Sequence, residues 1–384
     1  MHHKIKIELS DIISWCVIFL VTFGQLEVMI ANKVSNFTHL IISVLIFFHI
    51  IVNADRIKGG DAIHIIILLV SFLFLIFPSG KDLIADVSRL SWFFLIGFIG
   101  FHFKWFRAKY SSYISLVLKF YVFLGFVIIL DACLFFLEGR TYLFPVEYYL
   151  MPRFSGPFND PNFLGFIYGV LLISAIYSPQ ESRWKKIAQY ISVICILLSG
   201  SVSAIFFAIL SLALSNFFRL QYSIVKPIVC ILVSFVIYPV LYLYSDAFLD
   251  SFNMLTNTFF GLSNELSEIK FRSLIYRFES VSQAISLFAA NPLGYGHKTL
   301  LEFLPRDTHN SYVGMSFEFG IFPIIAILSS LAFRSYSKVS SAIVTYACLM
   351  AMMLNVHYSP IYIFVLLVAW INRDYRNTNA SSHS

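Results

Sequence analysis

Residues 113–137 read YISLVLKFYVFLGFVIILDACLFFL. This run exceeds the roughly 20 apolar residues that a helix needs to cross a bilayer. Of all residues in the chain, 59% are hydrophobic and 12% are charged, whereas a soluble domain averages about 25% charged residues. Counting similar runs predicts an all-α integral membrane protein with about 12 transmembrane helices in a single polytopic domain, residues 1–384. The predicted spans lie near residues 12–31, 37–53, 62–78, 87–103, 113–137, 162–177, 187–200, 203–218, 225–245, 311–333, 339–355 and 358–371.

The distribution of Lys and Arg predicts the orientation of these spans. Short loops on the cytoplasmic side of membrane proteins carry an excess of these residues. With both termini cytoplasmic, the inner loops hold 16 of the 27 basic residues, and two polar loops, 138–161 and 246–310, lie on the outer side. The net charge of +6 follows from this bias, so we expect no nucleic-acid partner. The inner basic residues are Lys4, Lys6, Arg56, Lys58, Lys104, Arg107, Lys109, Arg183, Lys185, Lys186, Arg219, Lys226, Arg334, Lys338, Arg373 and Arg376.

The shorter outer loop, 138–161, ends in a pattern that favours a helix start beside an arginine. Asp160 followed by Pro161 is typical of a helix N-cap and first helical residue. Helix N-termini suit anions, so Arg153 nearby is a candidate anion ligand. The alternative is that Arg153 contacts only lipid phosphate. The tyrosines of this loop either stack on sugars or form an interfacial aromatic belt.

The longer outer loop, 246–310, contains apolar residues at three- and four-residue steps, which predict an amphipathic helix over about 264–289, between spans 9 and 10. At 100° per residue, Arg277 lies on the edge of the apolar stripe and Arg272 points about 140° away. Glu268, four residues before Arg272, offers that side chain a surface ion pair. Of the two, we therefore prefer Arg277 as the ligand arginine. The stripe comprises Phe271, Leu274, Ile275, Phe278, Val281, Ile285 and Phe288.

The same loop ends in a glycine-rich turn and a histidine. The glycines of 292–296 permit positive φ and close approach of the backbone to a neighbour or ligand. Asp307 or Thr308 can cap the tenth span, which would place His309 in its first turn, where the helix dipole disfavours imidazolium. A neutral imidazole is what a general base requires. The alternative is a structural histidine at a helix start.

The order of these residues resembles the O-antigen polymerase and O-antigen ligase superfamily of bacterial inner-membrane glycosyltransferases. The similar elements are an arginine, a Pro-Leu-Gly-Tyr-Gly turn, and His-Asn followed by a glycine: Arg277, residues 292–296, His309, Asn310 and Gly320. The turn is one residue shorter than the family's pattern. The resemblance covers roughly residues 140–333.

An earlier segment adds to the resemblance. Arg153 with Gly156, Asp160, Pro161 and Asn162 is similar to the family's arginine-glycine-Pro-Asn segment. Residues 198–203 look like its junction between the seventh and eighth spans, although this chain has Val202 where the family often has an arginine.

The resemblance implies metal-independent transfer of a glycan from undecaprenyl diphosphate, with the active site on the periplasmic side of the inner membrane. Arg153 and Arg277 would stabilise charge on the departing diphosphate, because guanidinium groups are bidentate donors, and His309 would accept the proton of the acceptor hydroxyl. We expect no cofactor and no metal, since His297 and His357 lack partners at metal-ligand spacing. Further candidates for substrate binding are Arg272, Asn310, Asn162, Tyr295 and Arg140.

Several activities stay open at this point. A polymerase would transfer the glycan to another lipid-linked repeat unit, and a ligase to the lipid A core; we lean to the polymerase because strongly basic outer patches are sparse. A chain-length-regulating membrane protein is a partner that the polymerase interpretation allows. A flippase or other transporter would show charges inside spans and broken helices in matching halves. A membrane scaffold without catalysis would tolerate substitution of Arg277 and His309.

Overall fold

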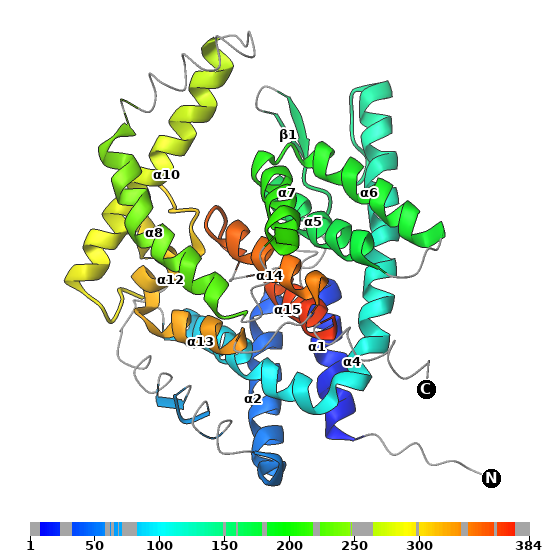
Figure 1. The fold of residues 1–384 in the computed structure, drawn as a ribbon, viewed down its shortest axis with the longest axis vertical. Helices are drawn as coiled ribbons and strands as arrows, with labels where there is room; N and C mark the ends of the chain where they lie inside the picture. The colour runs from blue at the N-terminus through cyan, green and yellow to red at the C-terminus, as the bar shows by residue number, and fades with distance from the viewer. Residues whose placement is uncertain are drawn as a thin grey trace.

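The computed structural model describes residues 8–23, 33–57, 83–148, 151–158, 160–178, 183–217, 223–245, 264–296, 299–331, 337–356 and 359–372, with a few positions between 62 and 70 and residue 247. Helices dominate these residues (Figure 1). The predicted termini and most of the predicted span 62–78 lie outside them.

Eight helices correspond to predicted spans, with ends that differ by a few residues. In the described residues, two stretches are long and apolar enough to cross a bilayer by themselves, Tyr113–Glu138 and Val225–Leu243, and seven shorter apolar helices accompany them. A largely helical membrane protein is therefore supported, and the number of 12 spans stays a prediction. The eight helices are α1 (Leu9–Phe23), α2 (Lys33–Val52), α5 (Pro161–Tyr177), α6 (Arg183–Ser199), α7 (Val202–Phe217), α8 (Val225–Leu243), α14 (Lys338–Ala351) and α15 (Pro360–Ile371).

One helix joins two predicted spans. We expected an inner loop between 87–103 and 113–137, but α4 runs unbroken over Leu83–Glu138 and changes direction between its two halves (Figure 1). The segment 104–112 contains basic residues but no Gly or Pro. Charge alone does not end a helix, whereas Gly and Pro disfavour it.

One predicted span is broken in two. Residues 311–333 form α12 (Ser311–Phe319) and α13 (Phe322–Ser330), because Gly320 between them adopts φ 70°. Glycine reaches this left-handed region without the steric cost of a Cβ atom.

Small elements complete the chain. The loop after α4 contains two short strands, β1 (Val146–Tyr148) and β2 (Pro152–Phe154), which pair antiparallel with Glu147 opposite Arg153. The prediction of a purely helical fold missed this hairpin. A 3-10 turn, η1, covers Ala54–Arg56, and a one-turn helix, α11, covers Leu300–Phe303.

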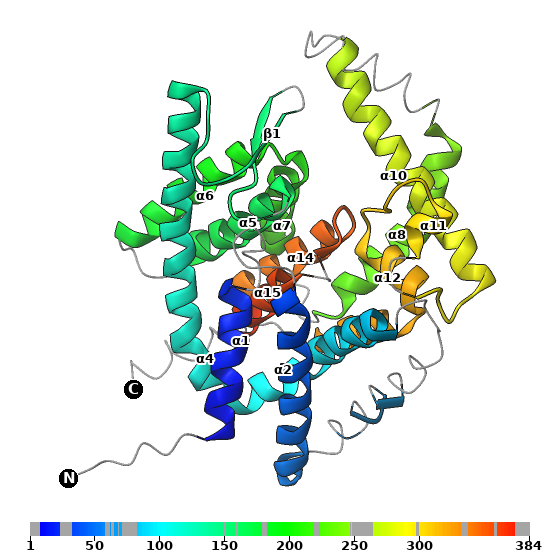
Figure 2. The ribbon, with the colours of Figure 1, turned by 180° about the vertical axis from the view of Figure 1, so that it is seen from behind.

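The helices form two groups around α14 and α15. On one flank, α5 packs against α6, α7 and α14 (Figure 1). On the other, the amphipathic helix α10 (Asn264–Ala290) packs against α8 and α12 (Figure 2). Helix α15 lies in the interior, since Ile361 to Trp370 are all buried. The start of α1 and the β1–β2 hairpin lie at opposite ends of the molecule in both views, and which end faces the cytoplasm stays a prediction.

Candidate functional site

Arg153 is held between two helix ends. Its Nε donates to the carbonyl oxygen of Ser199 at the end of α6, at 3.1 Å, and its Nη2 donates to Oδ1 of Asn162 at 3.1 Å. Gly200 lies directly against the arginine: a Cβ there would come within 3.1 Å of Cγ of Arg153. The glycine therefore leaves room for the arginine stem.

The predicted helix start at Asp160 is confirmed. The Asp160 carboxylate accepts the backbone N–H of Asn162 at 2.7 Å, and Pro161 is the first helical residue. The same oxygen accepts Nδ2 of Asn162 at 2.8 Å, which turns Oδ1 of Asn162 toward Arg153. Asn162 thus orients Arg153, and any contact it makes with substrate would come in addition to that.

Arg277 enters from the opposite flank. It is half-buried on α10, beside the buried Phe278, while Arg272 on the same helix is exposed. Its Nη1 donates to the carbonyl oxygen of Met353 at 3.4 Å. Burial lowers the pKa of Arg277; the charge of Arg153 adds to the shift and Asp160 opposes it. The guanidinium stays charged in any case, so two cations from two separate loops interact across one site.

His309 precedes a helix instead of standing in its first turn. The N-cap of α12 is Asn310, whose side chain accepts the N–H of Val313 at 3.2 Å, so the expected capping by Asp307 or Thr308 is wrong. His309 itself adopts φ 48°, and it is the one non-glycine residue in the described chain with positive φ. Such strain is uncommon and concentrates at functional sites. The side chain of His309 is exposed.

The surroundings of His309 favour the neutral ring. The neighbouring protein removes part of the water around it, and this desolvation lowers the pKa of His309. The positive charge of Arg277 lowers the pKa further, while Asp307 and Asp160 act in the opposite direction. Desolvation is the largest cause of the shift and the charge of Arg277 is the second. His309, Arg277, Arg153 and Asp160 form one electrostatic cluster.

Asn310 has a structural place. It is fully buried, and its Nδ2 donates to Ser234 on α8 at 3.1 Å while Oδ1 caps α12. Contact with a substrate would require these bonds to break.

Tyr295 likewise packs inside the protein. Its ring stacks on Phe317 with centroids 4.8 Å apart, and its hydroxyl donates to the carbonyl oxygen of Leu287 at 3.1 Å. The predicted role of Tyr295 in substrate binding gains no support from these contacts.

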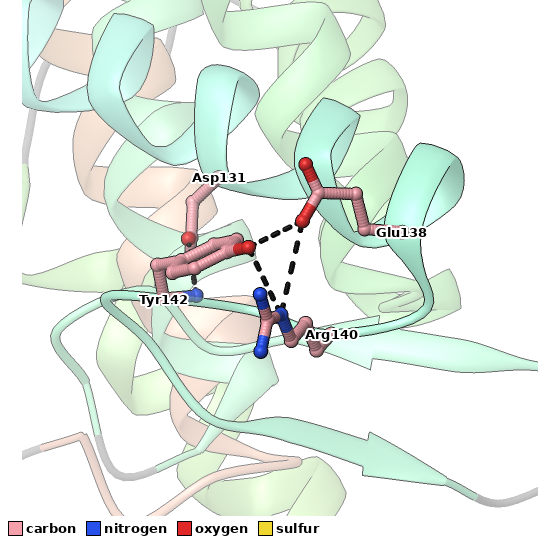
Figure 3. Close-up of polar contacts among 4 residues, drawn as sticks. All are labelled: Asp131, Glu138, Arg140 and Tyr142. Atoms are coloured by element: carbon pink, nitrogen blue, oxygen red, sulfur yellow. Dashed lines mark hydrogen bonds and ion pairs between the residues drawn. The ribbon is translucent and has the colours of Figure 1, made fainter.

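Arg140 belongs to a separate polar group at the end of α4 (Figure 3). Its Nε donates to the hydroxyl of Tyr142 at 2.9 Å and lies 3.7 Å from Glu138, which also accepts the Tyr142 hydroxyl. Beside them, the buried carboxylate of Asp131 accepts the N–H groups of Tyr142, Leu143 and Phe144 at 2.8, 3.1 and 3.0 Å. This group fixes the start of the loop, and a role of Arg140 in substrate binding stays a prediction.

The glycine-rich turn joins α10 to the broken helix. Tyr295 N donates to the carbonyl oxygen of Phe317 at 3.0 Å, and Gly296 N donates to that of Glu318 at 2.8 Å. A Cβ on Gly294 would lie 2.4 Å from the Glu318 oxygen, and one on Gly320 would lie 2.5 Å from the Pro292 oxygen. The expected close backbone approach is therefore confirmed, with a neighbouring segment as the partner. This joint fixes the end of α10 against α12.

The sequence argument missed the turn that follows α14. Residues 352–355 contact Tyr238, Arg277, Ser311 and Asp307 in succession. A polar Asn355 between apolar helices was the available signal, but its partners are more than 40 residues away in the chain. Such pairing follows from tertiary packing alone.

Comparison with protein families gives one match. The family model described as O-antigen ligase matches residues 187–328, from α6 to α13. The match covers less than half of the chain, so it shows a similarity of this segment to that family. The similarity supports a membrane location and an enzyme of the glycosyltransferase type. Searches of curated proteins and of solved structures returned no match.

The matched segment contains Arg277, the glycine-rich turn and His309, while Arg153 and Asn355 lie outside it. The charge of Arg153 nevertheless acts on Arg277. Within the described residues, no group of three or more His, Cys, Asp or Glu side chains is arranged around a common metal position.

Proposed function

We propose that this chain is a surface-polysaccharide polymerase, which transfers a glycan from an undecaprenyl-diphosphate-linked donor to the acceptor sugar of a second lipid-linked repeat unit. The observation that carries the proposal is the cluster in which Arg153 and Arg277, from two different loops, interact electrostatically beside His309. Two cations suit a diphosphate, and an imidazole that favours its neutral form suits proton transfer.

The reaction follows from this arrangement. The acceptor hydroxyl oxygen attacks C1 of the donor sugar, and its proton passes to the imidazole of His309. The bond between C1 and the diphosphate oxygen breaks, and the electron pair remains on that oxygen. Arg153 and Arg277 stabilise the charge that develops there, as fixed donors do in other transfer reactions. The leaving diphosphate keeps its lipid, so the site belongs at the bilayer edge, on the periplasmic side of the inner membrane.

Metal-independent catalysis is part of the proposal. The guanidinium groups take the role that a divalent cation has in many phosphate chemistries, since both neutralise oxyanions. Arg153 is suited to this because two of its nitrogen atoms are already bonded to Ser199 and Asn162. The guanidinium is therefore held before substrate arrives.

Ligase activity is the second candidate, because the matching family model is described as O-antigen ligase. A ligase would use the same donor and transfer the glycan to the lipid A core. Transport is not proposed: the break between α12 and α13 packs against the glycine-rich turn, so backbone contact accounts for it.

A lipopolysaccharide gel separates these activities. The deletion strain is complemented with the wild-type gene, His309→Ala or Arg277→Ala, with membrane expression checked by immunoblot. A core carrying a single repeat unit in the deletion strain supports a polymerase, and bare core with polymer retained on the lipid carrier supports a ligase. Restoration of the wild-type ladder by both variants would contradict the assigned site.

A further inference from the structure

The turn between α14 and α15 contacts three helices near His309 and Arg277. The carbonyl oxygens of Met352, Met353 and Leu354 accept, in order, the Tyr238 hydroxyl at 2.8 Å, Arg277 at 3.4 Å and the Ser311 hydroxyl at 2.6 Å. The donors come from α8, α10 and the first residue of α12. Three successive carbonyl groups thus join three helices.

Asn355, the next residue, contacts the turn that carries His309. Its Nδ2 donates to Oδ2 of Asp307 at 2.7 Å. The other oxygen of Asp307 lies 3.4 Å from the backbone N–H of His309 and 3.5 Å from the Thr308 hydroxyl. The short bond from Asn355 therefore fixes one carboxylate oxygen, and the second oxygen supports the strained backbone of His309.

The orientation of the Asn355 amide is chemically determined. With the amide reversed, its oxygen would face the Asp307 carboxylate, two acceptors without a proton between them. The observed orientation leaves Oδ1 of Asn355 buried without a hydrogen-bond partner in the described protein. An unpaired buried carbonyl oxygen is costly. The amide keeps this orientation because its Nδ2 donates to the Asp307 carboxylate.

We propose that Asn355 is a positioning residue, which sets His309 relative to Arg277 by holding Asp307. The inference rests on the proposed function, because it assigns a role in the same site. Asn355 acts through its neighbours: its side chain donates to Asp307 in the turn of His309, and the carbonyl oxygen of Met353, two residues earlier, accepts Arg277. Residues 353–355 therefore contact both Arg277 and the turn that contains His309.

The charges around His309 give this role a signature in the pH profile. Arg277 on α10 lowers the pKa of His309, and Asp307 on its own turn and Asp160 at the start of α5 raise it. If Asn355 no longer holds Asp307 near the ring, the raising effect weakens and the pKa of His309 falls. The acid limb of kcat/KM, where the base becomes protonated, then moves to lower pH.

The test uses Asn355→Ala, Asp307→Asn, Asp307→Ala and the double variant Asn355→Ala with Asp307→Ala in purified full-length protein. Asn216→Ala is the matched control, since Asn216 is an exposed asparagine that accepts hydrogen bonds from Lys338 and Tyr177, away from the site. We expect Asn355→Ala to lower kcat by about 10- to 100-fold, the size of losing one hydrogen bond to a charged group. Asp307→Asn, which keeps the side-chain shape, should move the acid limb downward even if Asn355→Ala does not accumulate.

The double variant should resemble the single Asp307→Ala variant, because Asn355 has no carboxylate left to hold once Asp307 is replaced. The proposal would be overturned if the losses of kcat in the two single alanine variants multiply in the double variant while the acid limb of Asn355→Ala and Asp307→Asn does not move. Activity of Asn355→Ala within twofold of wild type would also overturn it. Hydrogen exchange of residues 306–312 gives a readout without catalysis: it should rise in Asn355→Ala and not in Asn216→Ala. Faster exchange in a protein without transferase activity would reject the proposed function and retain the contact.

Discussion

The two loops that we predict to lie on the outer side each contribute an arginine to the candidate site, but they hold it differently. The short loop is a hairpin pinned by Asp131, and its Arg153 has two bonds of 3.1 Å to protein oxygens. The long loop uses a 27-residue helix, and Arg277 on it donates to the carbonyl oxygen of Met353 at 3.4 Å. A pre-bonded guanidinium is fixed before the substrate binds, whereas a weakly bonded one keeps its donors for the ligand.

The difference separates two demands of phosphate chemistry. Orientation requires a donor whose direction is set in advance, and stabilisation of new charge requires donors that are free to bond the oxyanion. Arg153 fits the first demand and Arg277 the second. Four predictions test this comparison, beginning with His309.

The largest effect is expected at His309, which the long loop supplies alone. His309→Asn removes the base but keeps a residue that tolerates positive φ. We expect kcat to fall by about 10²- to 10⁴-fold, the usual contribution of a general base. His309→Ala should lose the same activity and also about 1–2 kcal/mol of stability through left-handed strain. Kinetics and thermal unfolding in detergent measure the two losses separately. Full activity in the Asn variant would remove His309 from the mechanism.

Lysine substitutions sharpen the contrast between the arginines. Lys keeps the charge but cannot make the forked pair of bonds. Arg153→Lys loses both anchoring bonds and should lower kcat/KM by about 100-fold, whereas Arg277→Lys loses one weak bond and should lower it by about 10-fold. Arg272→Lys decides between the two arginines of α10: a loss greater than that of Arg277→Lys would make Arg272 the ligand arginine.

Substitutions at the contact between residues 292–296 and the end of α12 should destabilise the protein. Alanine at Gly294 or Gly320 would combine positive φ with a Cβ atom only 2.4 or 2.5 Å from a backbone oxygen. Each substitution should therefore lower the free energy of unfolding by about 2–4 kcal/mol. Gly139→Ala is the matched control, because Gly139 has φ 76° but no atom within 4 Å of the added Cβ. It should cost about 1–2 kcal/mol from strain alone. Equal losses of melting temperature at all three positions would show that packing adds nothing.

The smallest effect concerns pH. Because the pKa of His309 is lowered from 6.5, the acid limb of kcat/KM should lie below pH 6.5. Arg277→Gln removes a charge that lowers this pKa, so the limb of its residual activity should move upward, opposite to the shift expected for Asp307→Asn. The folded state disfavours the protonated ring of His309. The free energy of unfolding should therefore decline as pH falls below 6.5, where the ring of the unfolded chain binds a proton. A limb that does not move would exclude electrostatic contact between Arg277 and His309.

The sequence predicted the parts that depend on local composition. Apolar runs located most helices within a few residues, and Asp160-Pro161 located the start of α5. The apolar stripe of α10 placed Phe278 and Val281 in the interior, where both are buried.

The features that the sequence did not predict depend on contacts between residues far apart in the chain. The helix break at Gly320 depends on backbone contact with the turn near Pro292. A hydropathy pattern does not predict such a contact. Asn310, rather than Asp307 or Thr308, caps α12 because Ser234 on a distant helix also bonds it. The role of Asn355 likewise depends on a partner 48 residues away in the sequence.

The joint between residues 292–296 and α12 restricts insertions more than substitutions. Its two hydrogen bonds connect consecutive residues, Tyr295 and Gly296, to consecutive carbonyl groups, Phe317 and Glu318. Adding one residue to the turn would shift this register and turn the next donor away from its acceptor. Leu293, whose side chain is 49% exposed, can vary in chemistry without changing the register. In this turn, chain length is therefore under stricter physical control than side-chain identity.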